Sequence, residues 1–217
     1  MTEKPTMHCQ RELEEDLRHD GILPDATLLK WSRDQYSTSG HLLTLYAMAR
    51  GLNAKTMLEI GFGRSTFVLA KAAHENGGEL ITCDYRDFSY LLSEKEKQIT
   101  TFICGRSDDV WKSLNKGVDF AFLDYFSDAT ITEKFCVYEI SKCVSFMRTN
   151  GLITIHDATK DEYSVEKSLK RISRSRNLEL VSLPYWNGLA VIRSMEKSKY
   201  GIIEDTFIKK PDIKADS

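Results

Sequence analysis

The stretch from Thr56 to Thr66, TMLEIGFGRST, constrains the fold more than any other part of the chain. Residues 57–60 are mostly apolar and predict a buried strand, and the residues from Ser65 onward predict a helix. Gly61 and Gly63 separate the two elements, and glycine adopts backbone angles that are closed to other residues. The free N–H groups at the start of such a helix point toward a ligand bound at the turn. The stretch predicts a nucleotide-type cofactor site, although a lone G-x-G turn also occurs as a simple tight connection.

The alternation of apolar strands and helices continues along the chain. Near-continuous apolar runs are typical of strands buried on both faces of a parallel sheet. Asn187-Gly188 predicts a hairpin, so the last two strands are expected to be antiparallel. The predicted strands cover residues 57–60, 79–83, 101–104, 118–123, 152–155, 178–183 and 189–192.

This order of elements predicts an α/β fold. We expect a doubly wound, mostly parallel seven-stranded sheet with helices on both faces and a C-terminal antiparallel β-hairpin, which is a Rossmann-like architecture. Residues 41–194 are predicted to form the cofactor-binding domain. Residues 1–40 are predicted to be a helical cover segment, and residues 195–217 a charged tail.

Composition limits the classes of partner. The chain has 217 residues, enough for one domain with a sizeable core, and its net charge of −2 gives no reason to expect nucleic acid or an anionic membrane as main partner. No apolar run approaches membrane-spanning length. Five scattered cysteines, with Cys83 and Cys104 in predicted core strands, favour buried reduced thiols. We therefore expect a cytoplasmic protein.

Four acidic residues end predicted strands, namely Glu59, Asp84, Asp124 and Asp157. Ligands of open parallel sheets bind at the carboxyl ends of the strands. Glu59 is costly to bury unless it meets donors or a cation, and it suits an amino group better than a pyrophosphate. Asp84 ends the second strand of the first strand–helix–strand unit, where an acid accepts hydrogen bonds from ribose hydroxyls. This edge of the sheet is the predicted ligand site.

These pieces together resemble a known family. The set LEIGFGRST at residues 58–66, Asp84, FLD at 122–124, NGLITIHD at 150–157 and the closing hairpin is similar to the class I S-adenosylmethionine-dependent methyltransferases. Within that class the set is most similar to the small O-methyltransferase branch, which includes catechol O-methyltransferase-like enzymes. The resemblance covers about residues 42–193 and implies transfer of a methyl group from S-adenosylmethionine, most simply to a hydroxyl of a small molecule.

The resemblance also implies roles for single residues. The turn would hold the methionine part of the cofactor, and Asp84 the ribose. Tyr85, with Gly105, Arg106 and Ser107, would line the adenine region. An acidic rim suits the cationic sulfonium, so Asp124 is also predicted at the cofactor. The turn residues expected to bind are Glu59, Gly61, Phe62, Gly63 and Ser65.

Activation of the acceptor hydroxyl has three open readings. Catalytic candidates are Asp124, His156 and Asp157. By the resemblance, a divalent cation such as Mg²⁺ would be held by acids at the ends of the fourth and fifth strands, which Asp124 and Asp157 match, and by a neighbouring Asn, which Ala158 replaces. His156 is alternatively a general base, or a histidine hydrogen-bonded below the site.

Two other classes of function compete with methyl transfer. A NAD(P)-dependent oxidoreductase of Rossmann type would have to place a pyrophosphate beside Glu59, and a cofactor-binding protein without turnover is a third reading. A small-molecule acceptor and a homodimer are expected partners. Residues that would face the acceptor are mostly aromatic and carry no code for its identity: Trp31, Tyr36, Tyr125, Phe126, Asp128 and Trp186.

Overall fold

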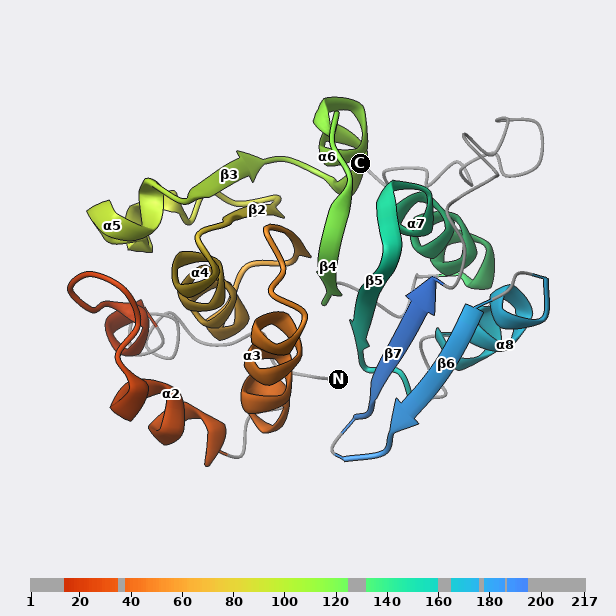
Figure 1. The fold of residues 1–217 in the computed structure, drawn as a ribbon, viewed down its shortest axis with the longest axis horizontal. Coiled ribbons are helices and arrows are strands. Elements are labelled where there is room, and N and C mark those ends of the chain that lie inside the picture. Colours follow the sequence, from red (N-terminus) through yellow and green to blue (C-terminus); the bar gives the residue numbers. More distant parts are fainter. Residues whose placement is uncertain are drawn as a thin grey trace, which may run out of the picture.

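One seven-stranded sheet organises the protein (Figure 1). The computed structural model describes residues 14–34, 38–124, 132–159, 165–175, 178–185 and 187–194. The strand order is β3-β2-β1-β4-β5-β7-β6. β1 to β5 pair in parallel, whereas β7 pairs antiparallel with both β5 and β6, which confirms the predicted fold class. The strands are β1 (Thr56–Ile60), β2 (Glu79–Asp84), β3 (Thr100–Cys104), β4 (Val118–Leu123), β5 (Met147–His156), β6 (Leu178–Leu183) and β7 (Leu189–Ser194).

The register of the sheet brings the acidic strand ends to one edge. Ile60 of β1 pairs with Leu123 of β4, and Leu123 pairs with Ile155 of β5. The residues that follow these three therefore leave the sheet side by side. The chain order reverses between β1 and β4, and the carboxyl edge at such a switch point is where open α/β sheets bind ligands.

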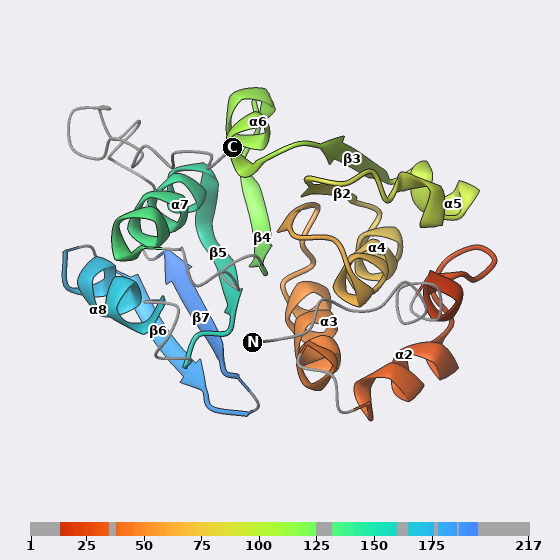
Figure 2. The same cartoon turned by 180° about the vertical axis from the view of Figure 1, so that it is seen from behind.

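Helices cover both faces of the sheet (Figures 1 and 2). Side chains of β1 alternate between the faces: Met57 packs in the same cluster as residues of α3 and α4, and Leu58 packs with residues of α6, α7 and α8. Both faces of β1 are thus buried, as its continuous apolar pattern predicted. The helices are α2 (Asp25–Ser32), α3 (Leu42–Gly51), α4 (Arg64–Asn76), α5 (Glu94–Lys97), α6 (Ser107–Ser113), α7 (Glu133–Phe146) and α8 (Val165–Ser175), with 3-10 turns η1 (Ser39–His41) and η2 (Ser89–Leu91).

The N-terminal part of the described chain lies over α4. Residues 14–17 are helical, and the core residues Leu17, Leu28 and Trp31 pack with Phe67 and Val68 of α4. We call residues 14–41 the cover. Its boundary at residue 40 stays a prediction, and the predicted tail at 195–217 lies outside the described residues.

Two details differ from the sequence expectations. The Asn150-Gly151 turn predicted before the fifth strand lies inside β5, which starts at Met147. α7 runs directly into that strand, and the extra residues are absorbed by a register shift opposite β4, where Asn150 has a φ of 66°. Cys104 is exposed rather than buried because β3 is an edge strand.

A search of the described residues for a helix that is both long and apolar enough to cross a membrane finds none.

Candidate functional site

The two glycines of the turn after β1 serve different purposes. Gly61 has a φ of 102°, and a Cβ at this residue would lie 2.4 Å from the backbone oxygen of Asp124. Gly61 is therefore required where the ends of β1 and β4 approach each other closely. Gly63 has extended backbone, and a Cβ there would meet nothing within 4 Å. Open space thus lies beside the backbone that begins α4, where a ligand can approach the helix N-terminus.

Glu59 braces this turn from inside the protein. Its side chain is 0% exposed, and its carboxylate accepts hydrogen bonds from the hydroxyls of Ser65 (2.6 Å), Thr66 (2.6 Å) and Thr82 (2.7 Å). Burial raises the pKa of Glu59 to about 7; the three hydroxyls oppose this shift and the charge of Asp124 adds to it. The sequence analysis placed Glu59 against the cofactor's ammonium group. In the structure its oxygens face Ser65 and Thr66 of α4 and Thr82 of β2.

Asp84 joins the end of β2 to the same turn. Its carboxylate accepts one backbone N–H from Phe62 at 3.1 Å and another from Arg86 at 3.1 Å. Each carboxylate oxygen has a second lone pair, so the half-buried group retains capacity for ribose hydroxyls. Glu59 and Asp84 therefore lie on neighbouring strands beside one turn, as the cofactor reading requires.

The predicted adenine residues follow β2 and β3. The Tyr85 side chain is 69% exposed, with the Arg86 guanidinium 5.0 Å from its ring centroid. Gly105 donates its N–H to the backbone oxygen of Asp84 at 2.8 Å, which places the start of α6 beside β2. Arg106 is exposed and Ser107 is buried there.

The Phe62 side chain points away from the predicted adenine residues. Its ring packs on Phe67, Phe88 and Phe102 with centroids 5.3–5.7 Å apart. Only the backbone of Phe62 is thus well placed for a ligand at the turn.

The predicted catalytic residues form a compact cluster at the ends of β4 and β5. His156 Nδ1 lies 2.9 Å from Asp124 Oδ1 and 3.6 Å from Asp157 Oδ1. Asp157 has a φ of 55°, an uncommon conformation for a residue other than glycine. The turn is held by the backbone of the hairpin, where Ala158 N–H donates to Gly188 and Thr159 N–H donates to Asn187.

The cover adds two polar groups to this cluster that the sequence analysis missed. Thr38 donates its hydroxyl to Asp124 Oδ2 at 3.1 Å. The ring of His41 lies 5.4 Å from that of His156 and 6.4 Å from that of Tyr185. Burial, followed by the neighbouring His156, lowers the pKa of His41 to about 4, so its imidazole is neutral at pH 7. Nothing in the sequence marks His41, which precedes an ordinary apolar helix.

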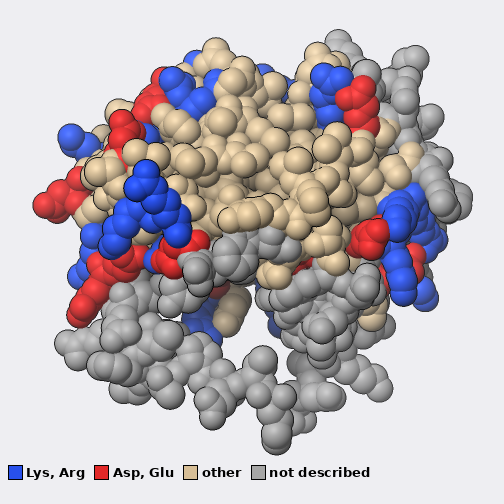
Figure 3. All heavy atoms as spheres, turned by 90° about the horizontal axis from the view of Figure 1, so that it is seen from below, with Lys and Arg blue, Asp and Glu red and all other residues tan. Residues whose placement is uncertain are grey.

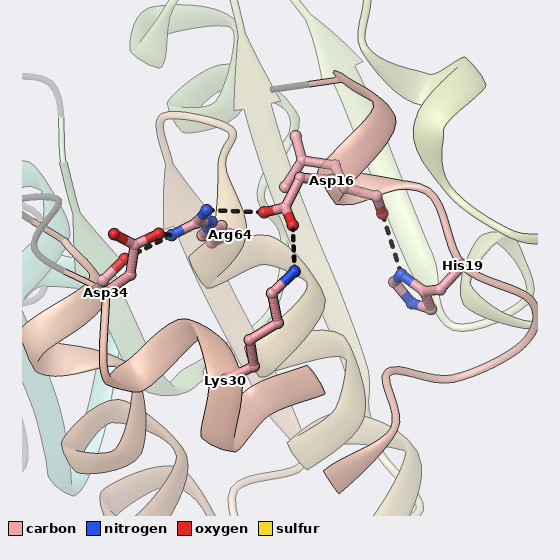
Figure 4. Close-up of polar contacts among 7 residues, drawn as sticks. Asp16, His19, Lys30, Asp34 and Arg64 are labelled. Atoms are coloured by element: carbon pink, nitrogen blue, oxygen red, sulfur yellow. Dashed lines mark hydrogen bonds and ion pairs between the residues drawn. The ribbon is translucent and has the colours of Figure 1, made fainter. Parts of the chain in front are cut away.

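Arg64, the first residue of α4, fastens the cover to the turn (Figure 4). Its guanidinium donates to Asp16 at 2.7 Å, to Asp34 at 2.7 Å and to Ser39 at 2.9 Å. Its Cζ also lies 5.4 Å from the ring centroid of Trp31. Trp31 is 1% exposed, so this proposed acceptor residue is part of the core. Five other residues expected near the acceptor lie outside the described residues: Tyr36, Tyr125, Phe126, Asp128 and Trp186.

Comparisons with known proteins bear on the domain and the fold. Residues 58–158 match a family model described as a methyltransferase domain. Comparison with curated proteins finds no match. Similar solved structures include the SAH-bound methyltransferase PaMTH1 from Podospora anserina, with 15% identity and a TM-score of 0.61 over 90% of this chain and 99% of that one.

Two further solved structures share the fold. Cofactor-bound Rv0187 from MTB has 18% identity and a TM-score of 0.63 over 90% of this chain and 92% of that one. An O-methyltransferase from Bacillus cereus in complex with SAH has 17% identity and a TM-score of 0.55 over 80% of this chain and 93% of that one.

Residues 58–158 thus match a methyltransferase domain, and the chain shares its fold with these solved methyltransferases. The domain match favours this class over the NAD(P)-dependent oxidoreductase considered from the sequence.

Proposed function

We propose that the protein transfers a methyl group from S-adenosylmethionine to a hydroxyl of a small molecule. In this proposal the cofactor lies over the turn at Gly61–Gly63 and the acceptor lies beside Asp124, His156 and Asp157. The observation that carries the proposal is the contact between the turn after β1, which is the cofactor half of the site, and the end of β4, which belongs to the acceptor half. The Gly61 Cα and the backbone oxygen of Asp124 are so close that no side chain fits between them. A methyl donor at the turn is thus next to the polar cluster.

Cofactor recognition is assigned to groups at the ends of β1, β2 and β3. The open backbone at Gly63 and the N-terminus of α4 suit the cofactor's carboxylate. Asp84 accepts the ribose hydroxyls, while Tyr85, Arg106 and Ser107 border the adenine. Glu59 and Ser65 act indirectly, because their side chains bond each other and hold the turn in shape.

The polar cluster is assigned to the acceptor. When bound, the cofactor supplies an activated methyl group, and the transfer is an in-line displacement in which an oxygen–carbon bond forms while the sulfur–carbon bond breaks. The hydroxyl loses its proton in this process, and His156 with Asp124 is the acid–base pair nearest to the turn. The neutral His41 ring faces His156 from the cover, and its lowered pKa makes it a weaker base than an ordinary histidine on the acceptor side.

We propose a small-molecule acceptor rather than nucleic acid, and the charge distribution on one face supports this choice. On the face in Figure 3, Lys and Arg are interspersed with Asp and Glu near the two sides, and uncharged residues lie between them. A nucleic-acid site would instead gather basic residues into one patch. A cytoplasmic location and a homodimer remain expectations from the sequence.

Two measurements on the full-length protein test the function. Isothermal titration should show binding of S-adenosylhomocysteine and no heat from NAD, and binding of NAD alone would overturn the proposal. Mass spectrometry of a panel of phenols, catechols and aliphatic alcohols incubated with S-adenosylmethionine should show a methyl ether. A methylated amine or RNA, with no ether from any alcohol, would keep the cofactor but refute the hydroxyl acceptor. Cofactor binding without any product would favour the non-catalytic reading.

A further inference from the structure

The cover is attached to the rest of the protein at two chemically different places. At the start of α4, Arg64 binds Asp16 and Asp34 through a guanidinium that stays charged across the physiological pH range. The second place is His19, which contacts Glu96 of α5. In Figure 4, Arg64 and His19 lie on the two sides of Asp16. Because an imidazole gains or loses its proton near neutral pH, the second attachment can respond to pH and the first cannot.

Both ring nitrogens of His19 face oxygen atoms. Nδ1 lies 3.0 Å from the backbone oxygen of Leu17, and Nε2 lies 2.8 Å from Oε1 of Glu96. Carbonyl and carboxylate oxygens accept hydrogen bonds, whereas a neutral imidazole carries a single N–H. Only the imidazolium can donate to both oxygens at once. The geometry is therefore complete when His19 is protonated, and a neutral ring gives up one of the two hydrogen bonds.

Glu96 is buried beneath this contact. Its side chain is 0% exposed, and Oε2 accepts the backbone N–H of Ser93 at 3.0 Å. Ser93 is the N-cap of α5, and its hydroxyl donates to the backbone oxygen of Gly21 at 2.6 Å, so one end of α5 binds the cover twice. A buried carboxylate is costly when the charge of its partner is removed. Loss of the proton from His19 therefore weakens the attachment of the cover to α5.

The charged groups around His19 favour its protonated form. Burial lowers the pKa of His19, but the hydrogen bond and charge of Glu96, a backbone oxygen and the charge of Asp20 outweigh burial, so the pKa lies above its ordinary value of 6.5. From α2 and α4, the uncharged rings of Trp31 and Phe67 face the imidazole, with centroids 6.4 and 5.2 Å away.

A groove of about 360 Å³ connects this contact to solvent. Residues 18–20 of the cover line one side of it and residues 90–93 the other, and its charged or titratable members besides His19 are Arg18, Asp20 and Tyr90. Arg18 places its Cζ 6.0 Å from the centroid of the Tyr90 ring. Since His19 is itself on the wall of the groove, it can exchange its proton with water while the sheet stays folded.

The same part of the cover forms a wall at the cofactor turn. Glu14 and Leu17 lie on one side of a cavity of about 110 Å³ that residues 62–64 border on another side. Leu17 is also the residue whose backbone oxygen contacts His19. Loosening of the His19 contact therefore loosens the wall of a cavity that reaches Gly63.

We propose that His19 and Glu96 form a pH-sensitive latch, which keeps the cover docked on α5 and the turn while the imidazole is protonated and lets the cover open more often when the imidazole is neutral. Because the pKa of His19 is raised in the docked state, the latch is fully formed below about pH 6.5 and is lost as pH rises through the higher pKa. His41, near the other end of the cover, stays neutral throughout this range, since its pKa is lowered to about 4. The competing explanation is an ordinary ion pair that affects the whole domain equally.

Native-state hydrogen exchange of the full-length protein tests the latch. Exchange is read by mass spectrometry at pH 6 and pH 8.5 and is corrected for its intrinsic dependence on pH. Protection of residues 14–34 should fall several-fold relative to that of β1 and β4 as pH rises. β1 and β4 are the internal reference because Glu59, whose pKa is about 7, acts on the stability of the whole domain. A constant ratio between cover and reference would overturn the proposal.

Variants assign the effect to His19. His19→Gln keeps an N–H donor toward Glu96 but cannot titrate, so its cover should show at both pH values the low protection that the unmodified protein has at pH 8.5. His74→Gln is the matched control, since His74 is exposed on α4, and it should keep the full pH dependence. Glu96→Gln gives a second reading if His19→Gln does not fold, because an uncharged partner no longer favours the imidazolium. Unaltered pH dependence in a folded His19→Gln or Glu96→Gln protein would refute the latch.

The latch and the proposed methyl transfer fail separately, because the latch needs neither cofactor nor acceptor. A pH-dependent cover in a protein that binds no S-adenosylhomocysteine would support the latch and refute methyl transfer. Binding of S-adenosylhomocysteine by a protein whose cover does not respond to pH would refute the latch alone.

Discussion

The carboxylates in the two halves of the candidate site differ in their hydrogen-bond partners. In the cofactor half, Glu59 accepts three hydroxyl hydrogen bonds and Asp84 accepts two backbone N–H groups. In the acceptor half, Asp124 and Asp157 crowd around one histidine, and one oxygen of Asp157 has no hydrogen-bond partner among the described residues. The first half is internally satisfied, whereas the second leaves a buried carboxylate oxygen without a hydrogen bond from the part of the chain that the structure describes.

This difference indicates how each half meets its ligand. A satisfied network fixes the shape of the turn before any cofactor arrives, and such preorganisation lowers the ordering cost of binding. The acceptor half instead holds polar groups in positions that cost stability until a cation or an acceptor supplies partners. Substitutions in the cofactor half should therefore change stability and cofactor affinity, and those in the acceptor half mainly acceptor chemistry.

The largest effect is expected at the contact between the halves. Gly61→Ala places a Cβ 2.4 Å from a backbone oxygen at a φ of 102°, so β1 and β4 must separate. We expect a loss of about 4 kcal/mol in the free energy of unfolding, measured with urea, together with loss of cofactor binding.

Gly63→Ala is the matched control for Gly61. Its Cβ meets nothing within 4 Å and its backbone is extended, so stability should change by no more than about 0.5 kcal/mol. Affinity for S-adenosylhomocysteine should nevertheless fall, because the added methyl group faces the ligand space. Equal destabilisation by both substitutions would show that the turn has no open side.

A smaller effect is expected from pH at Glu59. Burial raises its pKa from an ordinary value of 4.5 to about 7, so between these values the unfolded chain is ionised and the folded chain is not. Unfolding then releases a proton, and stability falls as pH rises from about 4.5 to about 7, by about 3 kcal/mol in total. In Glu59→Gln, the free energy of unfolding measured with urea should not show this decrease between pH 5 and pH 7.5. Parallel pH profiles for both proteins would contradict the shift.

Arg64 connects the halves, because its partners belong to the cover that carries Thr38 and His41 (Figure 4). Arg64→Met keeps the apolar stem but removes two largely shielded ion pairs, and we expect a loss of about 2 kcal/mol in urea unfolding. Lys30→Met removes only an exposed ion pair with Asp16 and should cost about 0.5 kcal/mol or less. Similar losses from both would mean that Arg64 is an ordinary surface charge.

The smallest effect is expected at Asp84. Asp84→Asn keeps the shape of the side chain and weakens its hydrogen bonds to ribose hydroxyls, so affinity for S-adenosylhomocysteine should fall about tenfold, or about 1.4 kcal/mol. Asp87→Asn is the control in the same loop, where the exposed carboxylate accepts hydrogen bonds from the backbone N–H and hydroxyl of Ser89. Calorimetric titration of both variants checks the assignment, and unchanged affinity in Asp84→Asn would remove this residue from the cofactor site.

Most of the fold was predictable because the signal is local. A strand buried on both faces needs a nearly uninterrupted apolar run, and β4 has the bounds that its run predicted; the edge strand β6 also has its predicted bounds. The error at Asn150-Gly151 has a tertiary cause: a sequence typical of a turn was accommodated as a bulge because β4 supplies pairing on both sides of it. The exposure of Cys104 likewise depends on which strand lies at the edge of the sheet. No single segment of the sequence determines the strand order.

The sequence by itself determined the parallel sheet, the glycine turn and the acids at the strand ends, because periodicity and strand termini are properties of short segments. The tertiary structure decided how those acids are used. Burial on neighbouring strands turned Glu59 inward to three hydroxyls, and the cover brought Thr38 and His41 from a distant segment to Asp124 and His156. Such contacts depend on packing between elements far apart in the chain, and the energy of a buried charge depends on everything packed around it.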